Sequence, residues 1–148
     1  MTTTTILCTD GSELANLALA AGLPLLAPAD RTMLVTVVEP LDASLVTGVS
    51  GFGTGVISPE QFTQADEVRR QAADQIVEEA LRIVAGHDVE GTVIEGDPGR
   101  AIVDLATEVG ATVVVMGSRG HGGLRRAVLG SVSDHVVRNA PCSVLITS

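Results

Sequence analysis

The sequence predicts a single α/β domain (residues 1–148), an open sheet of five parallel strands lying between two layers formed by four helices. Three observations predict this class. The chain has 148 residues, the size of one domain, and short apolar runs alternate with helical patterns along it. With two Phe and no Trp or Tyr, the core must be aliphatic, as is typical of parallel sheets covered on both faces. Strict alternation of strand and helix then predicts right-handed βαβ crossovers.

Five short apolar runs are expected to form the strands. They cover residues 6–9, 32–38, 89–94, 112–116 and 143–147. The second run is rich in β-branched residues and stops at Glu39-Pro40, and the fourth, which reads TVVVM, is the clearest buried strand. Because ligands of such sheets bind beyond the carboxyl ends of the strands, the residues that follow each run are the candidates for function.

Four helices are expected between these strands. They cover residues 13–21, 59–85, 100–109 and a last segment that ends at 139. The second has the strongest start signal, with Ser58 as N-cap, Pro59 in the first turn and Gln61 completing a capping box. Residues 41–58 loosen into Gly, Ser and Thr, and we expect a mobile loop there. Its glycine cluster at 51–55 superficially matches a dinucleotide-binding pattern, but no helix opens on the third glycine, so we interpret it as loop.

Composition argues against several classes of function. The formal net charge of −9 argues against a nucleic-acid or membrane surface, because either needs a basic patch. All nine basic residues are Arg, and the absence of Lys excludes a P-loop lysine and a Schiff-base enzyme. Cys8 and Cys142 are too few for a disulfide framework or a zinc site, and we interpret both as small buried residues. Without a signal-peptide pattern or an apolar run of roughly 18 residues, a cytoplasmic location is expected.

The segment from Gly117 to Ser133 carries the strongest functional signal. Its first four residues, GSRG, directly follow the fourth strand, and its last four, GSVS, open the last helix. Glycines with positive φ let successive amides point toward an anion, while a helix N-terminus adds unsatisfied amides and a favourable dipole. No acidic residue occurs between Glu108 and Asp134. The residues therefore favour a phosphate-binding loop, with a solvated glycine-rich surface loop as the alternative.

Three stretches stand out along the chain: VVVMGSRG at 113–120, LGSVS at 129–133 and APCSV at 140–144. Together they closely resemble the universal stress protein family. The opening ILCTDGS at 6–12 and the Gly96-Asp97-Pro98 turn are also similar, so the resemblance spans nearly the whole chain apart from residues 41–58. The spacing from Gly117 through Gly120 to Gly130-Ser131 matches the ATP-binding pattern of that family.

The resemblance implies an adenine nucleotide alpha hydrolase-like fold with strand order 3-2-1-4-5. It implies that Asp10 faces the ribose or a phosphate-bound Mg²⁺ or Mn²⁺, and that Val38 holds the adenine of ATP through its main chain. The candidate nucleotide-binding residues are Thr9, Asp10, Val38, Met116, Gly117, Arg119, Gly120, Gly130, Ser131, Val132 and Ser133. From the residues alone, Asp10 has an alternative role as the cap of the helix that follows it. The resemblance also implies a homodimer through the last strand, residues 143–147.

The resulting hypothesis is an ATP-binding regulatory module of the stress response, in which nucleotide occupancy alters loop order or dimer state. A slow ATPase is the second hypothesis, with Asp10 as metal ligand and Arg119 offsetting developing charge. Efficient phosphoryl transfer needs metal, nucleophile and charge stabilisation together, and no such constellation stands out. A nucleotide-free dimerisation or partner-binding module is the alternative. A flavin or redox protein is disfavoured, because the chain has no Trp or Tyr and only two Phe with which to stack on a flavin.

Overall fold

A parallel sheet of five strands forms the middle layer of the fold. In the computed structural model, which describes residues 1–47, 56–118 and 129–148, the strands are β1 (Thr4–Cys8), β2 (Arg31–Val38), β3 (Glu90–Glu95), β4 (Val113–Gly117) and β5 (Ser143–Thr147). Their order is β3-β2-β1-β4-β5, and every neighbouring pair is parallel. This confirms the predicted fold class and strand order, and the ends of the strands lie within about two residues of their predicted positions.

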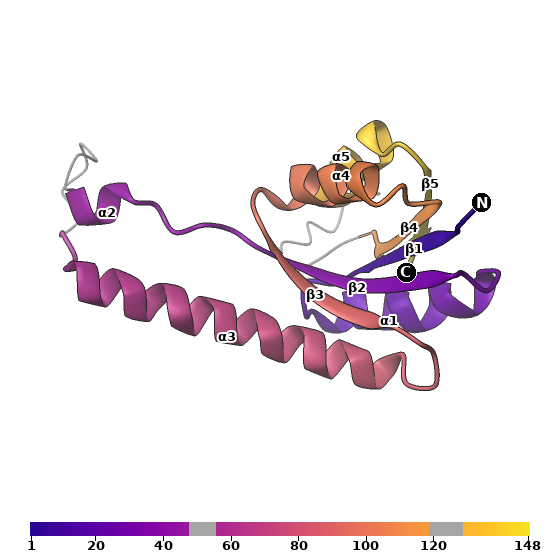
Figure 1. Cartoon of the computed structure of the whole chain (residues 1–148), viewed down its shortest axis with the longest axis horizontal. Coiled ribbons are helices and arrows are strands. Elements are labelled where there is room, and N and C mark those ends of the chain that lie inside the picture. Colours follow the sequence, from indigo (N-terminus) through magenta and orange to yellow (C-terminus); the bar gives the residue numbers. More distant parts are fainter. Residues whose placement is uncertain (48–55, 119–128) are drawn as a thin grey trace.

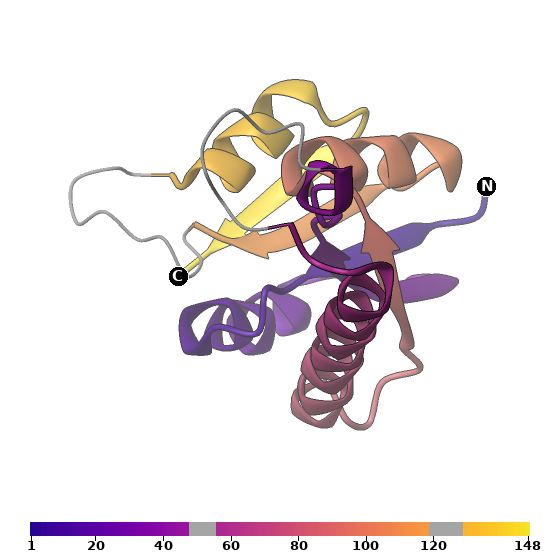
Figure 2. The same cartoon turned by 90° about the vertical axis from the view of Figure 1, so that its left-hand side faces the viewer.

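Helices cover both faces of the sheet. The helices α1 (Glu13–Gly22) and α3 (Pro59–Ile83) lie on one face, and α4 (Pro98–Glu108) and α5 (Ser131–Asn139) lie on the other (Figures 1 and 2). A short 3-10 turn, η1 (Leu23–Leu25), follows α1. Helix α4 begins earlier than predicted because the Asp97 side chain accepts a hydrogen bond from the Arg100 amide, which makes Asp97 the N-cap. None of the helices in these described ranges is long and apolar enough to cross a membrane.

The stretch expected to be a loop contains a helix. Residues Ser44–Thr47 form α2, which lies beside the N-terminal end of α3 (Figure 1). Four residues are too few to show a helical period, so α2 has no sequence signal. The glycine cluster at 51–55 lies outside the described residues. The capping box is confirmed, since the Ser58 amide donates to Gln61 Oε1 at 2.8 Å and the Gln61 amide donates to Ser58 Oγ at 3.2 Å.

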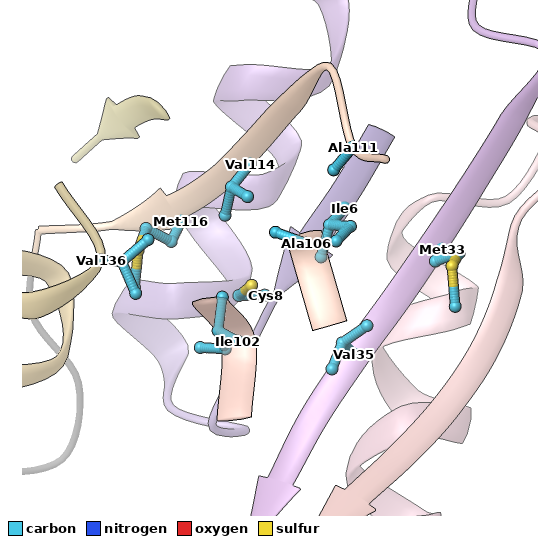
Figure 3. Packing of buried hydrophobic residues seen from close by; sticks show 10 residues of the cluster. All are labelled: Ile6, Cys8, Met33, Val35, Ile102, Ala106, Ala111, Val114, Met116 and Val136. Atoms are coloured by element: carbon cyan, nitrogen blue, oxygen red, sulfur yellow. The ribbon is translucent and has the colours of Figure 1, made fainter. Parts of the chain in front are cut away.

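The core has two parts, one on each face of the sheet. On the α4/α5 face it consists of Ile6, Cys8, Met33, Val35, Ile102, Ala106, Ala111, Val114, Met116 and Val136 (Figure 3). On the α1/α3 face it consists of Leu7, Leu19, Leu34, Val77, Ala80, Val84 and Val115. The core is aliphatic as predicted, because neighbouring residues of the central strands point to opposite faces and both faces are covered.

Two glycines allow helices to approach the sheet closely. A Cβ built on Gly22 of α1 would lie 2.7 Å from a methyl group of Val115, and one built on Gly91 of β3 would lie 2.5 Å from a methyl group of Val77. Both distances are shorter than real Cβ contacts, so a larger residue would push the helix away from the sheet. Cys8 is buried as expected, whereas Cys142, in the turn that leads into the edge strand β5, is only half-buried.

Candidate functional site

The order of the strands reverses at β1. The chain continues to β2 and β3 on one side of β1 and then crosses to β4 and β5 on the other, so the carboxyl ends of β1 and β4 are neighbours. Leu7 pairs with Val115, and the same register continued by two residues puts Thr9 level with Gly117. Ligands of open α/β sheets bind in the crevice at such a reversal. The fold therefore brings two predicted site residues together from distant parts of the sequence.

The turn after β1 is held by its own side chains. Asp10 Oδ1 accepts hydrogen bonds from the Ser12 amide at 3.0 Å and the Ser12 hydroxyl at 2.6 Å. The Ser12 hydroxyl oxygen in turn accepts from the Ala15 amide at 3.2 Å and caps α1. Gly11 has a φ of +81°, a conformation that glycine adopts without strain. The cap is thus Ser12, and Asp10 orients the capping residue instead of capping the helix itself.

Thr9 is buried, and the fold engages all of its polar groups. Its amide donates to the Val35 carbonyl at 3.0 Å, and its carbonyl accepts from the Thr36 hydroxyl at 2.8 Å. Its hydroxyl donates to Asn16 Oδ1 at 2.9 Å and accepts from the Gly11 amide at 3.1 Å. Thr9 therefore shapes the floor of the crevice. The sequence did not single out Thr36, because its contact with Thr9 joins β2 to β1 across 27 residues, or Asn16, because its contact depends on how α1 packs against the end of β1.

The end of β2 forms the next part of the crevice. The Val38 carbonyl accepts from the Gly96 amide at 3.0 Å, so the main chain of Val38 is turned toward β3. The Val35 carbonyl accepts from the Thr9 amide, so the main chain of Val35 is turned toward β1. By the alternation of a strand, Val37 shares the direction of Val35. Because the pairing of β1 with β2 ends at Thr9, the peptide groups of Val37 face the space beyond the end of β1.

The N-terminus of α5 lies on the other side of the crevice. Its N-cap is Gly130, with φ −76° and ψ 169°, and no side chain of the described ranges caps it. The first bond within the helix is donated by the Asp134 amide to the Gly130 carbonyl at 2.9 Å, so the amides of Ser131, Val132 and Ser133 have no acceptor within α5. In α1, α3 and α4, by contrast, the side chains of Ser12, Ser58 and Asp97 accept such a bond. An uncapped helix N-terminus attracts anions.

The base of the glycine-rich segment is closed by hydrogen bonds to the Ser118 carbonyl. That oxygen accepts from the Gly130 amide at 2.7 Å and from the Ser133 hydroxyl at 2.9 Å. Ser133 as a residue is only 2% exposed, and its hydroxyl also lies 3.1 Å from the Gly130 carbonyl oxygen. This hydroxyl therefore ties α5 to the end of β4, which leaves the Ser133 amide to face a ligand. Met116 likewise points its side chain into the core and offers only main chain to the crevice.

The glycines at the two ends of the segment do not have the positive φ that the sequence predicts. In the described residues, positive φ occurs at Gly11, Gly86, Gly96 and Gly110 but at neither Gly117 nor Gly130. The predicted left-handed glycines are therefore not found at the two ends of the segment. Arg119 and Gly120 lie outside the described residues.

The charge near the start of α5 is partly balanced. Asp134, in the first turn, accepts from Arg138 Nε at 2.9 Å, and this hydrogen bond lowers the pKa of the Asp134 carboxyl. The ion pair with Arg138 partly neutralises the charge of Asp134 and so reduces its effect on the amides of Ser131, Val132 and Ser133. Among residues 1–47, 56–118 and 129–148, no group of three or more His, Cys, Asp or Glu side chains is placed to hold a metal ion.

Comparison with known proteins places the chain in a family. The family model described as the universal stress protein family matches residues 1–148. The chain belongs to the universal stress protein family. Among curated relatives, Universal stress protein Sll1388 of Synechocystis sp. is 40% identical over 87 residues, which cover 59% of this chain and 53% of that relative. The chain thus spans about half the length of that relative.

Solved structures of universal stress proteins share the fold. The hypothetical protein MJ0577 of Methanocaldococcus jannaschii is 25% identical with a TM-score of 0.68, and the match covers 99% of this chain and 96% of that one. A universal stress protein in complex with cAMP is 25% identical with a TM-score of 0.59, covering 99% and 98% of the two chains.

Proposed function

We propose that this universal stress protein is an ATP-binding regulatory module whose nucleotide lies across the carboxyl ends of β2, β1 and β4. The observation that carries the proposal is the uncapped N-terminus of α5 beside the point where the strand order reverses. Such a helix end is an anion site, and the crevice at the reversal is where open sheets bind nucleotides. The cAMP complex of a similar family member supports an adenine nucleotide as the ligand.

The phosphates would lie against the amides of Ser131, Val132 and Ser133. These donors point out of α5 at the end of β4, and among the residues that the structure describes no side chain caps them. Gly117 and Gly130 flank them and leave room for a close approach of phosphate to main chain. Arg119 and Gly120 would complete the cradle, as the family pattern implies.

The adenine would lie at the end of β2, and the register favours Val37 over Val38 as its main-chain partner. The Val38 carbonyl is engaged by Gly96, whereas the peptide groups of Val37 face the crevice. An N–H and a C=O from one residue match the acceptor and donor on the pairing edge of adenine. Guanine presents the opposite pattern on that edge and would leave both groups unpaired, so we expect discrimination against GTP.

Asp10 would contact the ribose or a divalent cation that arrives with the nucleotide. A carboxylate oxygen is a ligand that Mg²⁺ and Mn²⁺ accept, and Mg²⁺ is commonly held by one or two carboxylates together with phosphate oxygens and water. Asp10 leads out of β1 toward the crevice, so a single carboxylate at this position suits a cation held mainly by phosphates. Slow hydrolysis is the most that this arrangement supports, because phosphoryl transfer also needs a placed nucleophile and charge stabilisation.

We further propose a homodimer through β5. This strand lies at the edge of the sheet, next to β4 alone, so one row of its peptide groups is open to a second copy. Pairing of two β5 strands around a two-fold axis would make a closed, symmetric interface. Sedimentation of the protein with and without ATP would test both the dimer and its response to nucleotide.

The decisive experiment is calorimetric titration of nucleotide-stripped protein with ATP, with and without Mg²⁺, and with GTP as the control. A Gly130→Asp variant tests in addition whether the phosphates bind at the N-terminus of α5. The extended conformation of Gly130 suits aspartate, whose carboxylate would cap α5 and occupy the phosphate position. We expect this variant to be at least as stable as the unaltered protein and to lose ATP binding. Gln75→Glu, which adds the same charge on the exposed face of α3, should bind normally.

The outcomes separate the candidate functions. Saturable binding of ATP, rejection of GTP and loss of binding in Gly130→Asp would support the nucleotide site. Unchanged binding in Gly130→Asp would move the phosphates away from α5. A folded protein that binds no ATP would contradict the proposal and favour the nucleotide-free dimerisation or partner-binding module.

A further inference from the structure

One guanidinium group joins three elements at the edge of the sheet where β2 and β3 end. Arg69 of α3 donates from Nη1 to the main-chain carbonyl of Glu39, the residue after β2. From Nη2 it donates to Asp66 Oδ1, one turn earlier on α3, and it reaches Glu95 Oε2, at the end of β3, at 3.3 Å. Helix α3 runs alongside β3 and past the ends of these strands (Figure 1). Arg69 therefore lies close to the proposed adenine position.

The neighbouring arginine shares two of these partners but not the third. Arg70 donates to Asp66 Oδ2 at 2.9 Å and to Glu95 Oε2 at 2.6 Å. In the described residues, Arg70 makes no hydrogen bond or ion pair with β2 or with Glu39. The Arg70 side chain is 55% exposed, whereas that of Arg69 is 17% exposed. The pair thus separates two contributions: both arginines tie α3 to β3, and Arg69 in addition fixes the main chain that leaves β2.

The burial of Arg69 indicates that it holds the main chain after β2 in place. Its Nε is buried and has no hydrogen-bond partner in the described part of the chain. A buried donor without an acceptor is destabilising, and exposed ion pairs contribute little in return. The carbonyl of Glu39 lies just beyond β2 and before Pro40, which has no N–H with which to continue the strand pairing, and its donor comes from α3 and not from a neighbouring strand. Arg69 supplies that donor.

We propose that Arg69 is a positioning residue for recognition of the base. The last main-chain groups of β2 are held from both sides: the Gly96 amide holds the Val38 carbonyl, and the Arg69 guanidinium holds the Glu39 carbonyl. These two bonds set the direction of the peptide groups of Val37, which would read the edge of adenine. This inference rests on the proposed function. It adds a residue on α3 that does not touch the ligand and yet sets its specificity.

The test compares Arg69→Gln with Arg70→Gln by calorimetry, using ATP and inorganic tripolyphosphate as ligands. Each change removes one charge and the contacts to Asp66 and Glu95, but only the first releases the Glu39 carbonyl. We expect Arg69→Gln to bind ATP about tenfold more weakly, the worth of one charge-assisted hydrogen bond. Its affinity for tripolyphosphate should equal that of the unaltered protein, because the N-terminus of α5 is untouched. Arg70→Gln should match the unaltered protein for both ligands.

The result that overturns the inference is distinct from failure of the proposed function. Equal losses for ATP and tripolyphosphate in Arg69→Gln, or the same behaviour in both variants, would make Arg69 a purely structural residue. If Arg69→Gln does not fold, the comparison is made between Arg69→Lys and Arg70→Lys. Lysine keeps one donor group at each position, so Arg69→Lys should lose less than tenfold in ATP affinity and Arg70→Lys should lose none; equal ATP affinities in the two variants would overturn the inference. Failure of the unaltered protein to bind ATP would contradict the nucleotide site itself, and this inference with it.

Discussion

We expect the free energy of unfolding to fall as the pH rises above about 9, because of the buried thiol of Cys8. Cys8 belongs to the same buried cluster as Ile102 of α4 (Figure 3), and burial raises the pKa of its thiol from 9.0 to about 12. Between these values the unfolded chain releases the proton and the folded chain keeps it. Stability that is fully present below the unfolded pKa is therefore lost as the pH rises toward the folded pKa. One proton corresponds to about 1.4 kcal/mol per pH unit, so the loss from pH 9.5 to 10.5 should be about 1 kcal/mol.

The composition makes this loss measurable. The sequence contains no Lys and no Tyr, so the residue types that usually titrate near pH 10 are absent. The assay is urea unfolding under reducing conditions at several pH values from 8.5 to 10.5. Cys8→Ala should flatten the pH dependence, whatever its effect on stability at neutral pH. Cys142→Ala should keep most of it, because the half-buried Cys142 thiol has a pKa that burial also raises but is partly in contact with solvent. An unchanged slope in Cys8→Ala would refute the reasoning.

Two further predictions concern the crevice. Asp10→Ala should weaken ATP binding more in the presence of Mg²⁺ than in its absence, because the carboxylate would contact the cation. Calorimetry measures both affinities. Equal losses with and without Mg²⁺ would make Asp10 a ribose contact, or a residue that only supports Ser12. Ser133→Ala should lower the free energy of unfolding by about 1–2 kcal/mol, since it removes the buried hydroxyl that donates to the Ser118 carbonyl. Its ATP affinity should change little, and a large loss of affinity at unchanged stability in denaturant would contradict the structural role of that hydroxyl.

The positions of the strands and most helices could be predicted because their signals are local. The bounds of β5 agree with the apolar run at 143–147, and the capping box at Ser58 and Gln61 is formed as its sequence pattern predicts. Such signals depend on residues within about one turn of each other, so no knowledge of the rest of the fold is needed. The two ends of the glycine-rich segment could be located in the same way, since one follows a strand and the other begins a helix.

Contacts between distant segments could not be predicted. The choice between Val37 and Val38 depends on the register of β2 with both of its neighbours, which one sequence does not contain. From the sequence alone, the Ser133 hydroxyl could contact a phosphate. Only the fold shows that it donates to the Ser118 carbonyl at the end of β4. Two oxygen-bearing side chains, Asp10 and Ser12, precede α1, and only their mutual hydrogen bonds show which of them is the cap. The contact of Arg69 with the Glu39 carbonyl spans 30 residues and has no local sequence signal.

The hydrogen bond between the Ser118 carbonyl and the Gly130 amide holds the end of β4 next to the start of α5. When two ends of a chain are held together in this way, doubling the length of the chain between them costs only about 0.6 kcal/mol of closure entropy. A longer or foreign peptide should therefore be accepted between Ser118 and Gly130 without displacing β4 or α5. This segment is accordingly a natural place for grafting new ligand preferences, or a reporter group, onto an otherwise unaltered scaffold.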